Sequence, residues 1–131
     1  IKSSAASDVY KRQVFDLLTD MESNRKHGYD YIILDPPAFT KSRDTIGSAV
    51  KGYKAINAKA MKLLPRGGYL ATCSCSHFMT DELFRKMLHN AAEDAGVQLR
   101  QIEARQQAPD HPILWNVPET DYLKFYLFQV V

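Results

Sequence analysis

The sequence has little of several features that would settle its class at once. It contains only two cysteines, Cys73 and Cys75, which stand one residue apart and would point the same way in a strand, so a disulfide scaffold does not suit it. No apolar run approaches the roughly 18 residues of a membrane span, and neither a secretory signal nor a repeat is recognisable. We therefore expect a cytoplasmic protein of a reducing compartment, with no membrane partner.

A strong excess of one charge is also lacking. The 131 residues carry a formal net charge of +2, which permits a nucleic-acid partner without requiring one. Hydrophobic residues make up 45%, enough for one modest core, whereas a complete doubly wound enzyme is usually longer. The length therefore predicts a fragment of a larger protein.

Residues 1–13 differ from the remainder of the chain. The segment IKSSAASDVYKRQ lacks an apolar period and is similar to translated adaptor sequence in assembled environmental DNA, so we expect a non-native leader. A natural polar linker is the alternative interpretation. The predicted division is thus a leader over 1–13 and a folded part over 14–131.

From residue 14 onward, helical and strand patterns alternate. Apolar residues at helical spacing predict helices over about 14–25, 50–64 and 80–95. Continuous or alternating apolar runs predict strands over about 29–34, 69–74, 97–105 and 122–130, with a long Pro-containing excursion before the last. The run up to Leu34 lacks polar alternation after Tyr31, as in a strand covered on both faces at the centre of a sheet. The pattern predicts an α/β fold.

Polar and reactive residues follow two of the predicted strands. Asp35-Pro36-Pro37 comes directly after Leu34, and the segment TCSCS over 72–76 ends the strand that begins at residue 69. The carboxyl ends of neighbouring parallel strands are where open α/β sheets place their active sites. A carboxylate and a thiol that meet there favour covalent catalysis on an electron-poor ring.

Several motifs, taken in order, resemble one enzyme family. They are DPPAF at 35–39, GYKAIN at 52–57, LLPRGG at 63–68, SCS at 74–76, DHP at 110–112 and PETDYLK at 118–124. Together they resemble the C-terminal part of the bacterial ribosomal RNA large-subunit methyltransferase I family, S-adenosylmethionine-dependent cytosine carbon-5 methyltransferases. The resemblance implies a class I, Rossmann-like methyltransferase sheet, of which only the C-terminal half is here, with a final antiparallel strand pair. It also implies S-adenosylmethionine as cofactor, ribosomal RNA as partner and an RNA-binding PUA domain upstream.

The chemistry of that reaction suits these residues. Carbon-5 of cytosine is too weak a nucleophile to attack a methylsulfonium, but addition of a thiolate to carbon-6 turns the ring into an enamine that can. Such an enzyme needs a cysteine. Asp35 can hydrogen-bond the ring and its exocyclic amine, and Pro36 and Pro37 would hold the carboxylate outward. The same corner, Asp35 to Pro37, is expected to line the methionine side of the cofactor.

Two cysteines compete for the role of nucleophile. The family pattern is a Ser-Cys-Ser turn followed shortly by a Met, which places Cys75 on the catalytic position and Met79 in register. Cys73, in a Thr-Cys-Ser context, also resembles the wider RNA cytosine methyltransferases and stays a competitor. The other interpretations are that both cysteines are inert buried thiols, or that they bind a metal together with His77. Such a metal site lacks a fourth ligand and the spacing of a common zinc site, so we expect no metal.

Five further residues are candidates for binding the substrate. Phe39 could stack on the base, and Lys41 and Arg43 could bind phosphate, although packing and solvation are the plainer interpretations. His111 and Lys124 lie in segments that match the family and could face the base.

The cofactor site is expected to be incomplete. In the family, a Gly-rich turn and two acidic residues that hold the adenosine lie upstream of the segment matched here. The fragment is therefore expected to be inactive alone, and to leave the edge of the strand over 31–34 open to self-association.

Two rival functions stay open. A base amino-methyltransferase also uses an Asp-Pro-Pro corner, usually followed at once by an aromatic residue, whereas Ala38 stands here. Such an enzyme needs no cysteine. A noncatalytic RNA-binding fragment is the second alternative.

Overall fold

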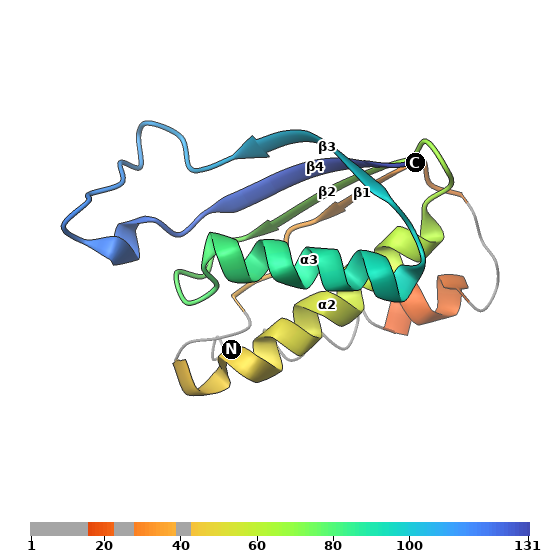
Figure 1. Ribbon diagram of the computed structural model, residues 1–131, viewed down its shortest axis with the longest axis horizontal. Coiled ribbons are helices and arrows are strands. Elements are labelled where there is room, and N and C mark those ends of the chain that lie inside the picture. The colour runs from red at the N-terminus through yellow and green to blue at the C-terminus, as the bar shows by residue number, and fades with distance from the viewer. Residues whose placement is uncertain (1–15, 23–27, 39–42) are drawn as a thin grey trace.

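The computed structural model describes residues 16–22, 28–38 and 43–131, and shows one sheet with helices on one side of it (Figure 1). The sheet holds four strands in the order β1-β2-β4-β3. Their bounds are Tyr31–Leu34 for β1, Tyr69–Ser74 for β2, Leu99–Arg105 for β3 and Lys124–Val130 for β4. Helices α2 (Ile46–Leu63) and α3 (Asp81–Ala95) lie side by side against the sheet, and short 3-10 helices span Arg43–Thr45 (η1) and Pro118–Thr120 (η2).

The pairing of the strands determines which strand ends lie next to each other. β1 runs parallel to β2, with Leu34 opposite Thr72, so both strands finish at the same end of the sheet. β4 is antiparallel to both of its neighbours, and the long excursion that links it to β3 lies at that same end (Figure 1). The predicted α/β fold and its final antiparallel strand pair are therefore confirmed.

Local sequence explains where the helices begin and end. The side chain of Thr80 accepts a hydrogen bond from the Leu83 N–H at 3.2 Å, which caps the first turn of α3. Gly96 ends that helix in the left-handed conformation with φ of 69°. After α2, Pro65 and Gly68 turn the chain into β2; a Cβ on Gly68 would come within 3.0 Å of the Pro65 carbonyl oxygen. The predicted C-terminal ends of both helices and the predicted start of α3 are confirmed, whereas α2 begins at Ile46, earlier than the predicted start at about residue 50.

The core lies between the two long helices and the sheet. Tyr53 of α2 meets Phe84 of α3 edge-on with ring centroids 6.2 Å apart, and Phe84 in turn contacts Tyr126 of β4 at 6.0 Å. Other large, fully buried side chains are those of Met61, Leu70, Met79 and Met87. Since α2, α3, β2 and β4 all contribute, the arrangement holds the ends of β2 and β4 firmly. No described helix is long and apolar enough to cross a membrane.

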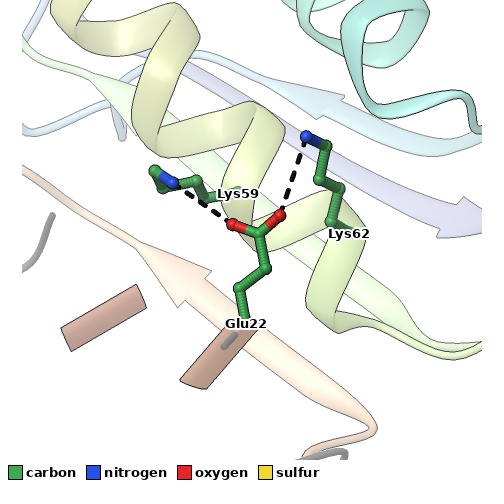
Figure 2. Close-up of polar contacts among 3 residues, drawn as sticks. All are labelled: Glu22, Lys59 and Lys62. Carbon is green, nitrogen blue, oxygen red and sulfur yellow. Dashed lines mark hydrogen bonds and ion pairs between the residues drawn. The ribbon is translucent and has the colours of Figure 1, made fainter. Parts of the chain in front are cut away.

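The helical residues 16–22 are attached to α2 by charge as well as by packing. Leu18 belongs to the buried core. Glu22 pairs with Lys59 at 3.2 Å and with Lys62 at 3.8 Å, so one carboxylate bridges successive turns of α2 (Figure 2). The remaining residues predicted for the first helix, and the leader over 1–13, lie outside the described residues.

The position of β1 differs from the prediction. It was expected at the centre of the sheet, covered on both faces, yet it is one of the two edge strands of the described sheet, β3 being the other. Ile33 is 67% exposed and Tyr31 is 48% exposed, with the Tyr31 ring stacked on that of Tyr69. The central position is therefore not found, whereas the separately expected open edge over 31–34 is present, since this apolar run has no strand partner on this side within the described chain.

Candidate active site

The corner after β1 presents a carboxylate at the end of the sheet. Asp35 is exposed, whereas Pro36 is buried and Pro37 half-buried. The proline rings therefore anchor the backbone while the carboxylate projects outward. Asp35, Pro36 and Pro37 lie where the sequence placed them, at the carboxyl end of the strand.

Cys73 meets this carboxylate directly. Its Sγ lies 3.2 Å from Asp35 Oδ1 and 3.4 Å from the carbonyl oxygen of Leu34. Burial, the hydrogen bond to Asp35 and the negative charges of Asp35 and Cys75 raise the pKa of the Cys73 thiol to about 12. The thiolate form of Cys73 is therefore strongly disfavoured at neutral pH.

Cys75 occupies a different environment. β2 ends at Ser74, so Cys75 lies beyond the strand in the turn that leads to α3, and it is exposed. The alternation that would have put Cys73, Cys75 and His77 on one strand face therefore does not continue. No group of three or more His, Cys, Asp or Glu side chains that could hold a metal ion occurs within the described part of the chain.

A buried polar network from α2 supports the end of β2. Thr72 Oγ1 donates to Asn57 Oδ1 at 2.7 Å, and Asn57 Nδ2 donates to the carbonyl oxygen of Tyr53 at 2.8 Å. Ser74 Oγ lies 3.2 Å from the Tyr53 hydroxyl. The Ser76 N–H donates to Ser74 Oγ at 3.4 Å, which carries this support into the turn around Cys75. Asn57 and Tyr53 are thus placed to support the turn.

Lys124 supports the same turn from the other side. It is opposite Ser74 in the β2–β4 ladder and is only 5% exposed. Its Nζ donates to the carbonyl oxygens of Ser76 at 2.5 Å and Tyr122 at 2.7 Å. The expected contact between Lys124 and the substrate stays a prediction. The sequence did not predict that Lys124 supports the turn. The available signal was a lone lysine at the start of an aromatic-rich strand.

A cavity of about 1040 Å³ opens beside the turn. Its lining includes His77, Lys124 and Arg85, together with the chain just beyond β3. His111 lies instead in a neighbouring cavity of about 560 Å³, is exposed, and has its Nδ1 3.1 Å from Asp110 Oδ1. The structure thus brings Asp35 into contact with Cys73, and Cys75 follows two residues later, while His111 lines a separate cavity.

Three of the candidate substrate residues concern parts of the chain outside those described. Phe39 and Lys41 lie outside the described residues, as does the side chain of Arg43. Their expected contacts with base and phosphate stay predictions.

Comparison with known proteins gives consistent results. No protein-family model matches the chain. Ribosomal RNA large subunit methyltransferase I from Pseudoalteromonas atlantica is 41% identical over 128 residues, which are 98% of this chain and 32% of that protein. The protein of the same name from Salmonella paratyphi B is 42% identical over 127 residues, 95% of this chain and 31% of the relative. The chain therefore spans about a third of the length of these curated relatives.

Solved structures agree on the fold. A protein from Streptococcus mutans described as a SAM-dependent methyltransferase aligns with a TM-score of 0.70 at 22% identity, over 89% of this chain and 29% of that one. A methyltransferase solved in complex with SAH aligns with a TM-score of 0.67, also at 22% identity, over 88% of this chain and 30% of its own. Over nearly its whole length, this chain is therefore similar to the C-terminal part of ribosomal RNA large subunit methyltransferase I, and it has the class I methyltransferase fold.

Proposed function

We propose that this chain is part of an S-adenosylmethionine-dependent enzyme that methylates carbon-5 of a cytosine in ribosomal RNA through a covalent cysteine adduct. The observation that carries the proposal is the contact of Asp35 with Cys73 at the carboxyl ends of β1 and β2, where Cys73 Sγ lies 3.2 Å from the carboxylate and Cys75 follows two residues later. The names of the relatives support ribosomal RNA as the substrate. The fold supports S-adenosylmethionine as the methyl donor.

The exposures of the two thiols favour Cys75 as the nucleophile. A base held against this end of the sheet can reach an exposed thiol in a turn more readily than a half-buried one in a strand. Cys73 also has its pKa raised to about 12, so it supplies almost no thiolate at neutral pH. Cys75 therefore remains our candidate for attack, with Cys73 as the neighbour that contacts Asp35.

The chain's own groups then have separate tasks. The Cys75 thiolate forms a bond to carbon-6, and the electrons of the carbon-5–carbon-6 double bond become available at carbon-5 for the incoming methyl group. Asp35 accepts a hydrogen bond from the exocyclic amine and orients the ring. After a base removes the carbon-5 proton, the sulfur–carbon-6 bond breaks, which restores the ring and the thiolate. S-adenosylmethionine supplies the methyl group, and Asp35, Pro36 and Pro37 would line its methionine side.

A chimera tests the proposal. Residues 14–131 are joined to the upstream part of the Pseudoalteromonas relative, and methyl transfer to ribosomal RNA is measured with labelled cofactor. Cys75→Ala should abolish methylation and Cys73→Ala should leave substantial activity; equal loss in both, or loss only in Cys73→Ala, would overturn the assignment.

A trapping experiment tests the covalent step. RNA containing 5-fluorocytosine should form a stable adduct with the chimera, because fluorine replaces the proton that must leave. Mass spectrometry of the digest should locate the adduct at Cys75. Methylation without any adduct, and unaffected by either cysteine variant, would instead indicate an amino-methyltransferase, and RNA binding without methylation would indicate a noncatalytic fragment.

A further inference from the structure

The only tryptophan of the chain stands in the excursion between β3 and β4. Trp115 is 95% exposed, at the first central position of a β-turn in which the Val117 N–H donates to the Leu114 carbonyl oxygen at 2.9 Å. The excursion extends beyond the sheet at the end where β1 and β2 finish (Figure 1). Single exposed apolar side chains are common on protein surfaces. What distinguishes Trp115 is the ordered support below it and the cavity beside it.

Side-chain hydrogen bonds hold the excursion in one shape. The Gln107 amide joins its two sides, because its nitrogen donates to the Thr120 carbonyl oxygen and its oxygen accepts from the Leu123 N–H at 3.3 Å. Thr120 Oγ1 in turn accepts a hydrogen bond from the Leu114 N–H at 2.8 Å, directly before Trp115. The turn that carries the indole ring is therefore bonded to the base of the excursion. A ring that is held before a ligand arrives loses little conformational entropy on binding.

A cavity of about 560 Å³ lies against this ring. Trp115, Pro109 and Pro112 give it flat apolar walls, and Gln106 and His111 add polar side chains. The Gln106 amide makes no hydrogen bond to another residue in the described part of the chain, so it is available to a ligand. Flat apolar walls beside amide and imidazole groups suit a nucleobase, whose faces stack and whose edges donate and accept hydrogen bonds.

This cavity adjoins the larger one beside the Cys75 turn. The larger cavity, of about 1040 Å³, is lined by His77, which follows Cys75 by two residues. A single RNA strand whose target base lies at Cys75 can therefore extend along the larger cavity and place a flanking base against Trp115. The residues that line both cavities are Gln106, Gln107, Ala108, Pro109 and Asp121.

The charged side chains along this path nearly balance. The basic group of Arg105 already pairs with Glu103 at 3.2 Å, and Lys124 Nζ is bound to two carbonyl oxygens. Charge alone therefore attracts phosphate only weakly here, and most of the binding has to come from the base. The charged residues that line the two cavities are Arg85, Arg105, Lys124, Asp81 and Asp121.

We propose that Trp115 and the cavity beside it bind an unpaired base of the RNA next to the target nucleotide, with the indole ring as the stacking surface. The proposal rests on the proposed function, which supplies RNA as the ligand. It adds a contact that determines substrate specificity outside the catalytic residues.

The first experiment uses the intrinsic fluorescence of the 131-residue chain, which reports on Trp115 alone. A single-stranded oligoribonucleotide of mixed sequence should quench the emission, whereas an abasic oligomer of the same length, with the same phosphates, should not. The logarithm of the binding constant should fall with the logarithm of the salt concentration with a slope no steeper than about −1.4, the value for two phosphates of a single strand. Equal quenching by both oligomers, or none by the mixed sequence, would overturn the proposal.

Variants then measure the contribution of the ring, with binding followed by the anisotropy of a labelled oligonucleotide. Trp115→Ala should weaken binding about tenfold, and Trp115→Tyr should stay within about threefold of the parent, because a phenol ring also stacks on a base. Leu114→Ala is the matched control and should change nothing, since this neighbour is 50% exposed and lines neither cavity. Unchanged affinity in Trp115→Ala, or an equal loss in Leu114→Ala, would refute the stacking contact.

The chimera distinguishes RNA from a protein contact at the same ring. Trp115→Ala should lower kcat/KM for RNA about tenfold, chiefly through KM. If the upstream part of the enzyme covers Trp115 instead, the substitution should lower the Tm of the chimera and leave KM for RNA unchanged, which would overturn the proposal. A chimera that methylates cytosine equally well with Trp115→Ala refutes this proposal alone. Quenching of Trp115 by RNA in a chain whose chimera never methylates refutes only the proposed reaction.

Discussion

The contact between Asp35 and Cys73 predicts that one carboxylate suppresses the reactivity of this thiol. With its pKa raised to about 12, Cys73 is ionised to about one part in ten thousand at pH 8, whereas an unperturbed thiol is ionised to about a quarter. Only the thiolate is alkylated, so Cys73 in the folded chain should react about three orders of magnitude more slowly than in urea. Asp35→Asn removes the charge and the anionic hydrogen-bond acceptor but leaves burial, the largest cause, in place. We therefore expect Asp35→Asn to lower the pKa of Cys73 only part of the way towards that of a free thiol, and to speed alkylation of Cys73 about tenfold or more.

The assay uses a Cys75→Ala chain, in which Cys73 is the only thiol. Iodoacetamide is added at pH 8, and the modified fraction is read by intact mass with and without Asp35→Asn. Asp44→Asn, at an exposed carboxylate of η1, is the control and should change nothing. Alkylation of folded Cys73 at nearly the unfolded rate, or no acceleration by Asp35→Asn, would refute the reasoning. The raised pKa also makes the free energy of unfolding depend on pH. The stabilising contribution of the protonated Cys73 is fully present below pH 9 and is lost as the pH rises towards 12.

Three further predictions follow from the site, the sheet edge and the helix cap. In the chimera, Asp35→Asn should slow methyl transfer by about two orders of magnitude or more with RNA affinity little changed, as filter binding can show; a matching loss of RNA binding would make Asp35 a docking residue. The 131-residue chain should self-associate through β1, and Ile33→Lys should shift it towards monomer in light scattering. Calorimetry should find that it binds S-adenosylmethionine no tighter than roughly millimolar. A monodisperse parent chain that binds the cofactor with micromolar affinity would contradict this view. Thr80→Ala should lower the free energy of unfolding by about 1 kcal/mol in urea titrations, with Thr80→Ser nearly neutral, and an equal loss in both would argue against the cap.

The order and type of the elements could be predicted because each depends on local pattern. The apolar run into Leu34, the Thr80 cap and Gly96 are short-range signals, and they placed β1, the start of α3 and its end correctly. The prediction that Asp35 and a thiol meet also followed from pattern, since two parallel strands finish at one end of a sheet.

The environments of single side chains could not be predicted in the same way. Cys73 and Cys75 are both small thiols one residue apart, and only the end of β2 at Ser74 separates them into a half-buried and an exposed position. The edge position of β1 likewise depends on which strands are present to pair with it, which no pattern within Tyr31–Leu34 records.

What the sequence determined by itself was the fold class, the sites of its turns and the chemical groups at the end of the sheet, because apolar period, capping residues and motif spacing are local properties. The tertiary structure decided which thiol contacts Asp35 and that Lys124 is buried against the Cys75 turn. Those outcomes depend on the register of β2 against β4 and on contacts between residues 38 and 48 positions apart, so they arise only when the sheet and helices pack together.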